Sequence, residues 1–157
     1  MRPGKKKPSC SAYDRALRLL SIRDHAEKEL RRKLRRAEHE PQEIDGAIER
    51  VRRLGYLNDA RFARLRAASL VTEGRFGPRG VAAKLQQAGV GEALVREAVA
   101  QAMDGKDELE LAAELLKKKH PDAFGSKDPK VRARAARYLV GHGFSSGVVA
   151  RVLRLEE

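Results

Sequence analysis

The side chains most often used for catalysis and metal binding are few and scattered in this chain of 157 residues. It contains four histidines, His25, His39, His120 and His142, and a single cysteine, Cys10. No HExxH motif, Ser-His-Asp order, paired-carboxylate motif or Cys-His pairing joins them. We therefore predict no catalytic residue, no metal site and no cofactor, with histidines that are solvated or cap helices. One cysteine cannot form an intramolecular disulfide, and a reducing cytoplasm is the expected compartment.

Basic side chains, in contrast, are abundant and unevenly placed. The chain carries 34 Lys and Arg against 22 Asp and Glu, which gives a net charge of +12. Residues 1–36 hold 13 basic and 4 acidic side chains, so most of the excess lies there. Such a balance indicates a polyanionic partner, which is nucleic acid, an acidic protein surface or an anionic membrane. No apolar stretch approaches the roughly 18 residues of a membrane-spanning helix. We expect no membrane partner.

The strongest basic cluster is the segment KELRRKLRR, residues 28–36. Helical spacing places its cations around an apolar stripe and along one solvent side, namely Lys28, Arg31, Arg32, Arg35 and Arg36. Like charges at this spacing repel one another, and an acidic partner would relieve that repulsion. Two interpretations stay open: a face that contacts a partner, and an exposed face that serves solubility.

A second candidate is the loop GRFGPRG, residues 74–80, which carries Arg75 and Arg79 in front of a predicted helix. A phosphate could bind at such a helix N-terminus. The GK[ST] ending of a P-loop is missing, however, and no strand precedes the loop. The segment is therefore either a turn between repeats or an arginine-bearing loop that contacts phosphate or an acidic protein. No helix is marked as one that reads a DNA sequence.

Helices must position all of these cations, because strand patterns are nearly absent. Aromatic residues make up only 4% of the chain, so the core must consist of Leu, Ala and Val. Apolar stripes with helical spacing predict about nine helices. Ser11 and Asp24 are expected to cap the first two, and Asn58 or Asp59 the fourth. In the fourth helix we expect Phe62, Leu65 and Ser69 to face inward, and we expect Tyr56 and Leu57 to pack inward just before it.

The predicted helices form three groups that share one register. Leu34, Leu85 and Leu139 align in the second helix of each group, and Glu38, Gly89 and Gly143 follow four residues later. The sequence thus predicts an all-α fold of three tandem three-helix repeats in an elongated, curved molecule. The protein is expected to be a monomer. The expected parts are a disordered basic arm (1–10), repeat 1 (11–56), repeat 2 (57–105) and repeat 3 (106–157).

Four segments resemble, in order, the sequence landmarks of the RecX family. They are RDHAEKELRRKL (23–34), RLGYLNDARFA (53–63), EGRFGPRGVAAKLQQAGV (73–90) and RARAARYLVGHGFSSGVVARVL (132–153). The most specific lies around Gly55, Leu57, Asp59, Arg61, Phe62 and Ala63. Two positions depart from the family pattern: Glu38 replaces a turn glycine, and Ala26 stands where a small hydroxyl residue is common.

This resemblance implies a non-enzymatic bacterial regulator built of tandem three-helix repeats. It implies binding to the RecA–single-stranded DNA filament, in its groove or at its growing end. The expected consequence is reduced filament extension, ATP hydrolysis, strand exchange and SOS repressor cleavage, and hence a role in homologous recombination and DNA repair. The alternatives are an autonomous, non-sequence-specific nucleic-acid-binding protein and a plain helical scaffold.

Overall fold

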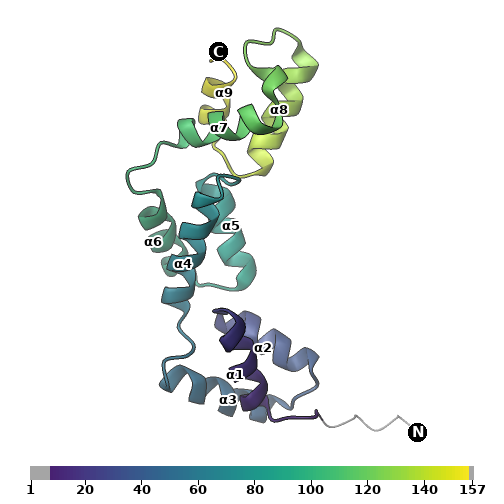
Figure 1. Ribbon diagram of the computed structural model, residues 1–157, viewed down its shortest axis with the longest axis vertical. Coiled ribbons are helices and arrows are strands. Elements are labelled where there is room, and N and C mark those ends of the chain that lie inside the picture. The colour runs from purple at the N-terminus through teal and green to yellow at the C-terminus, as the bar shows by residue number, and fades with distance from the viewer. Residues whose placement is uncertain (1–7, 156–157) are drawn as a thin grey trace, which may run out of the picture.

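The computed structural model describes residues 8–155 and is helical throughout this range, with no strand (Figure 1). The helices are α1 (Ala12–Ile22), α2 (Glu27–Arg36), α3 (Pro41–Arg53), α4 (Asp59–Thr72), α5 (Pro78–Ala88), α6 (Glu92–Met103), α7 (Glu108–Lys119), the short 3-10 helix η1 (Pro121–Ala123), α8 (Pro129–Gly141) and α9 (Ser146–Val152). The all-α prediction is confirmed. The predicted disordered arm falls largely on residues 1–7, which lie outside the described residues.

The helices form three units of three, each with its own apolar core. Within every unit the first helix packs most extensively against the third, as α1 does on α3, α4 on α6 and α7 on α9. The buried core residues divide in the same way. Two residues cross the first boundary, because Ala26 packs in the second core and Leu57 in the first. The predicted tandem three-helix arrangement is confirmed.

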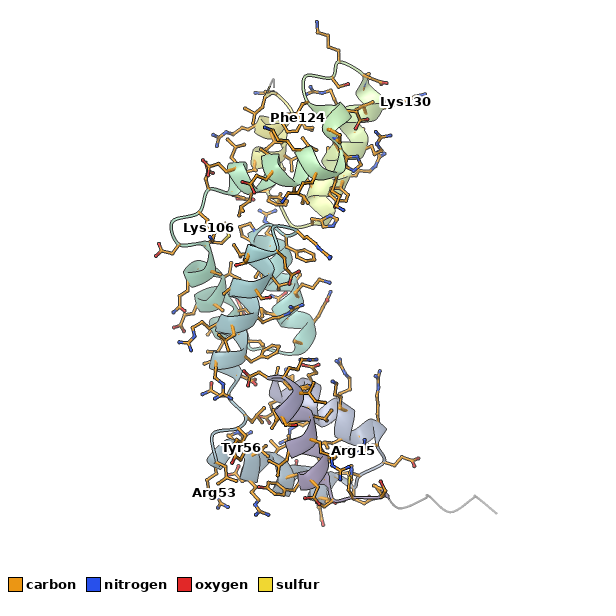
Figure 2. All side chains as sticks on the ribbon, in the orientation of Figure 1. Arg15, Arg53, Tyr56, Lys106, Phe124 and Lys130 are labelled. Atoms are coloured by element: carbon orange, nitrogen blue, oxygen red, sulfur yellow. The ribbon has the colours of Figure 1, made fainter. Side chains whose placement is uncertain are left out.

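The three units follow one another along the long axis of an elongated, shallow arc (Figure 1). The helices α2, α5 and α8 lie along one side of the arc, to the right in this view. The loops that join the units lie on the opposite side, where Tyr56 and Lys106 are labelled (Figure 2). Tyr56 is 51% exposed, so its predicted inward packing is wrong, whereas Leu57 is buried as expected.

The turn between the second and third helices has the same backbone geometry in all three units. An amide five residues after the aligned leucine donates a hydrogen bond to the carbonyl of that leucine. The pairs are His39 to Leu34 at 3.3 Å, Val90 to Leu85 at 3.1 Å and Phe144 to Leu139 at 3.2 Å. The repeat register predicted from the sequence is therefore present in the backbone itself.

The residue before each of these donors lies in the left-handed region. Gly89 and Gly143 have φ values of 90° and 85°, and Glu38 has a φ of 63°. Glu38 is the only non-glycine residue with positive φ in the part of the chain that the structure describes. Left-handed backbone costs a residue with a Cβ about 1–2 kcal/mol. The missing glycine in the first unit thus leaves the turn intact but strained.

The second helices stack end to end along the arc, and we call α2, α5 and α8 the second-helix column. Where α8 meets α5, the amides of Gly77 and Arg79 donate to the carbonyls of His142 and Gly143, at 2.9 and 3.2 Å. A Cβ built on Gly143 would lie 1.9 Å from the nitrogen of Gly80, so this contact requires glycine. Carbonyls at the C-terminal end of α8 thus accept hydrogen bonds from amides at the start of α5.

Two details of the predicted helices are wrong. Leu65 is 52% exposed and Ser69 is exposed, because α4 buries Ala63, Ala67 and Leu70 beside Phe62. Alanines give a weak hydropathy signal, so the hydrophobic pattern placed the larger Leu65 in the core although it lies on the outer face. The cap predicted for α2 also differs: the residue before this helix is Ala26, and Asp24 makes no cap hydrogen bond there.

Candidate functional site

The α2 cations lie in different environments. Arg31 is held by two carboxylates. Its Nε lies 3.0 Å from Glu27 Oε1, and its Nη1 lies 2.6 Å from Asp45 Oδ1 on α3. Burial opposes the charged form of Glu27, but hydrogen bonds from Arg52 and Arg31 outweigh this and lower its pKa. Arg31 is therefore engaged inside the first unit rather than presented to solvent with its neighbours.

Lys28 is an exposed residue whose stem contacts the second unit. A Cβ built on Gly89 would lie 2.5 Å from the Cβ of Lys28, so the lysine stem covers the turn that ends α5. This contact joins the first two members of the second-helix column. Lys28 thus combines an inter-unit packing role with a free positive charge.

Arg32, Arg35 and Arg36 remain as exposed cations on α2. Among residues 8–155, no carboxylate lies within 4.0 Å of any of the three guanidinium groups. Three such charges on one short helix repel one another and attract an anionic surface. They are the part of the predicted cluster that is available to a partner.

The second predicted group lies elsewhere on the molecule. Arg75 and Arg79 are exposed in and just after the loop between α4 and α5, at the contact with the third unit. Two amides that could hold a phosphate at this helix start, those of Gly77 and Arg79, are already bound to the carbonyls of His142 and Gly143. The length of α5, about 16 Å at 1.5 Å per residue, separates Arg79 from Lys28. The seven predicted residues therefore form two separate basic regions.

The family landmark around Gly55 joins the first two units. Asn58 caps α4, since its Oδ1 accepts from the amide of Arg61 at 2.9 Å. Asp59 instead reaches back and accepts from the amide of Glu27 at 2.8 Å, which supplies the cap that Ala26 cannot. Burial raises the pKa of Asp59, and the amide of Glu27 opposes this.

Arg61 completes this junction. Its guanidinium lies 3.0 Å from Asp24 Oδ1 and donates to the carbonyls of Gly55 and Tyr56, both at 3.1 Å. Asp24 is thus used for an ion pair rather than for the predicted cap. One arginine ties the loop, the end of the first unit and the start of the second together, which gives the landmark a structural role.

Two histidines lie in the interior, contrary to the prediction of solvated or capping roles. His25 is 2% exposed and His39 is 5% exposed. The Nδ1 of His25 lies 2.9 Å from the carbonyl of Arg23, and its Nε2 lies 2.9 Å from Lys33 Nζ. This fits a neutral ring that donates from Nδ1 and accepts at Nε2. Burial lowers the pKa of His25, which agrees with that assignment.

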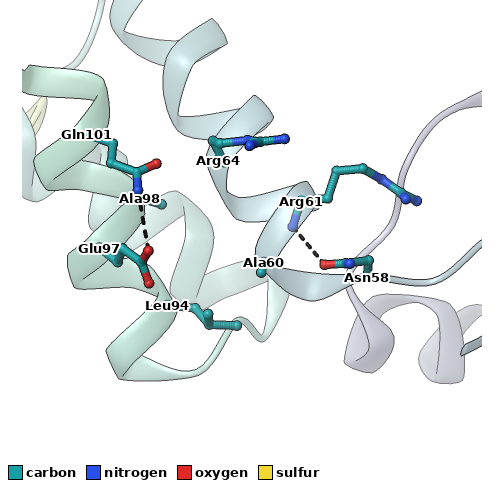
Figure 3. Close-up of a pocket in the computed structure, with 8 residues that line it drawn as sticks. All are labelled: Asn58, Ala60, Arg61, Arg64, Leu94, Glu97, Ala98 and Gln101. Atoms are coloured by element: carbon teal, nitrogen blue, oxygen red, sulfur yellow. Dashed lines mark hydrogen bonds between the residues drawn. The ribbon is translucent and has the colours of Figure 1, made fainter. Parts of the chain in front are cut away.

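A hollow of about 260 Å³ lies between the start of α4 and α6 (Figure 3). Glu97 and Gln101 bind each other along α6, with 3.3 Å between Gln101 Nε2 and Glu97 Oε1. Arg61 and Arg64 extend away from this pair (Figure 3). The polar groups that line the hollow do not converge on one point. The hollow therefore has no arrangement suited to acid–base or nucleophilic chemistry.

A larger groove of about 610 Å³ lies between the first two units and involves residues that the sequence reasoning missed. Arg32 of α2, Leu65 and Arg66 of α4 and Lys84 of α5 line it. The sequence pattern predicts Leu65 in the core, and Lys84 belongs to no basic run. A helical wheel that takes Ala63 and Ala67 as the buried stripe would have placed Leu65 outside.

No helix between residues 8 and 155 is both long and apolar enough to span a bilayer. Within the same range, no group of three or more His, Cys, Asp and Glu side chains is arranged so that it could hold a metal ion.

The chain matches the family models of all three RecX domains, in chain order. The first three-helix domain matches residues 12–50, the second residues 58–99 and the third residues 106–153. The chain belongs to the RecX family. These matches correspond to the three structural units described above.

Full-length relatives agree with this assignment. The regulatory protein RecX of Syntrophotalea carbinolica is 35% identical over 143 residues, which cover 90% of this chain and 94% of the relative. The regulatory protein RecX of Leptothrix cholodnii is 34% identical, with 96% and 92% covered. The crystal structure of RecX from Lactobacillus salivarius superposes with a TM-score of 0.75 at 20% identity and covers 91% and 92%, which supports the fold. A regulatory role therefore follows from the family.

Proposed function

We propose that this protein binds the filament that the RecA recombinase forms on single-stranded DNA and lowers its activity. The affected steps are filament extension, ATP hydrolysis, strand exchange and SOS repressor cleavage. The observation that carries the proposal is the ordered set of three RecX domains along the chain. The unpaired α2 cations support it, because both DNA and acidic protein surfaces would attract them.

The protein acts in this proposal as a cytoplasmic monomer whose units span neighbouring RecA protomers. Arg32, Arg35 and Arg36 form one contact region and Arg75 and Arg79 another, with Lys28 beside the first. Each region would face either DNA phosphate or acidic groups of the filament. Charge complementarity of this kind speeds association more than it fixes affinity.

A titration of RecA ATPase activity on single-stranded DNA tests the proposal. Inhibition is expected well below the protein concentration that coats the DNA. If inhibition appears only at coating concentrations, the protein is an autonomous nucleic-acid binder. If the protein neither inhibits RecA nor binds DNA at any salt concentration, the remaining interpretation is a plain helical scaffold.

A paired charge reversal tests the α2 region. The double variant Arg32→Glu, Arg35→Glu should weaken filament binding by more than about tenfold, since both cations change sign in the contact. Arg64→Glu, also on an exposed position, is the control and should inhibit like wild type. Unchanged inhibition by the double variant would remove the α2 region from the mechanism.

A further inference from the structure

The groove between the first two units combines an apolar floor with a basic rim. It lies between α2, α4 and α5 and has a volume of about 610 Å³. Leu65 supplies its exposed apolar surface, with the buried side chain of Phe62 beside it, and Arg32, Arg66 and Lys84 are among the cations that line it. This groove shares Arg32 with the α2 contact region considered above and extends from it onto the second unit, where Leu65 and Lys84 lie.

Leu65 is the unusual feature of the floor. It is 52% exposed, although its neighbours Phe62 and Ala63 are 6% and 1% exposed. A half-exposed leucine retains apolar surface whose burial against a partner is favourable. A partner that covers this side chain gains that free energy without any rearrangement of the core.

The charges around the groove are not balanced. Asp24 and Glu29 also line it, but Asp24 is paired with Arg61 at 3.0 Å and Glu29 with Arg23 at 2.5 Å. No carboxylate lies within 4.0 Å of the cationic groups of Arg32 or Lys84 in the described part of the chain. The groove therefore presents positive charge on both sides of an apolar floor.

We propose that this groove binds a segment of a partner protein that carries an apolar side chain flanked by carboxylates. The apolar side chain would cover Leu65, and the carboxylates would pair with Arg32 and Lys84. Single-stranded nucleic acid fits less well, because its bases require exposed aromatic faces for stacking and Phe62 is buried. The identification of the partner as RecA rests on the function proposed above. The kind of segment that the groove would bind is inferred from the groove residues alone.

A peptide-binding experiment tests the groove without RecA. The probe is a fluorescent peptide with one leucine between runs of glutamate, and its binding is followed by anisotropy. Leu65→Asp and Lys84→Glu should each weaken binding by more than about tenfold. The matched controls are Val140→Asp, at 54% exposed, and Arg64→Glu, and both should bind as wild type does.

Two results of the peptide experiment would overturn the groove proposal. One is no binding of the glutamate peptide by the wild-type protein, and the other is equal weakening by the groove variants and the controls. A glutamine version of the peptide should bind more weakly than the glutamate version. Equal binding of the two peptides would refute the role of the cations.

The complete filament provides the second arm. A photo-crosslinking amino acid in place of Leu65 should form its adduct with RecA, at a segment that contains both acidic and apolar residues. An adduct with DNA instead would overturn the proposal. If the wild-type protein fails to inhibit RecA at all, the proposed function fails, and the peptide experiment still decides the chemistry of the groove.

Discussion

At the scale of single residues, the network around His25 makes stability depend on pH. His25 faces Lys33 at Nε2, the carbonyl of Arg23 at Nδ1, and the nearby carboxylate of Glu29. Burial is the main cause of its lowered pKa, and the charges of Arg23 and Lys33 add to it. Protonation would give Nε2 a hydrogen directed at the ammonium group of Lys33, so the folded state favours the neutral ring.

The free energy of unfolding should therefore fall as the medium becomes acidic. A group with a lowered pKa in the folded state binds its proton more readily when unfolded. The stabilisation is complete above the unfolded pKa of about 6.5 and is lost as the pH falls below it. Urea unfolding at about pH 7.5 and pH 5.5 measures this loss, and His25→Gln should reduce it. An identical pH dependence in the variant would contradict the assignment.

Glu38 offers a second prediction at this scale. Its φ of 63° places a residue with a Cβ where the other two units have glycine. Glu38→Gly should raise the free energy of unfolding by about 1 kcal/mol, because it removes this strain. Glu38→Ala is the control, since it removes the carboxylate but retains the Cβ and should give no such gain. Thermal or urea unfolding distinguishes the two variants.

Among individual residues, the sequence predicted what depends on local spacing. The aligned leucines, the positions of the turns that follow them and the cap at Ser11 follow from neighbouring residues, and Ser11 Oγ accepts from the amide of Asp14 at 3.0 Å. The pairing of Arg31 with Asp45 and the cap of α2 by Asp59 depend on other helices. Such tertiary partners are invisible to periodicity.

At the scale of elements, the contact between α5 and α8 depends on close backbone approach. Gly143→Ala would place a Cβ 1.9 Å from the backbone nitrogen of Gly80, in a residue with φ of 85°. We expect a loss of more than about 1 kcal/mol in the free energy of unfolding. Gly55→Ala is the matched control, because Gly55 has a φ of 79° and nothing lies within 4 Å of a Cβ at that position. Equal stability of the two variants would show that the contact is dispensable.

The order of the helices could be read from the sequence, but the groove could not. Periodicity finds each apolar stripe, and the turn residues mark where helices end. The groove arises where α2 of one unit meets α4 and α5 of the next. No local sequence pattern encodes how these helices from different units lie relative to one another. The exposed arginines of α2 were predicted correctly as a solvent face, while Leu65 and Lys84 required the three-dimensional arrangement.

At the scale of the whole molecule, the three separate cores predict limited cooperativity. Leu34 and Leu139 occupy the same position in the first and third units, and both are 0% exposed. Either leucine-to-alanine substitution should cost about 2–5 kcal/mol within its own unit. Hydrogen exchange should show faster opening mainly in the unit that carries the substitution, as in other repeat proteins. Uniform acceleration along the chain would instead indicate one cooperative structure.

The two joints between the units differ in what must deform when the molecule bends. The second and third units meet through backbone hydrogen bonds and glycine-to-glycine contact at Gly80 and Gly143. The first and second meet through side chains, namely Asp59 on the amide of Glu27 and Lys28 over Gly89. Side chains can change rotamer, whereas the backbone contact leaves no room. In mechanical terms we expect the first joint to yield before the second, so a change in the pitch of the surface that the protein lies along would be absorbed mainly at the first joint.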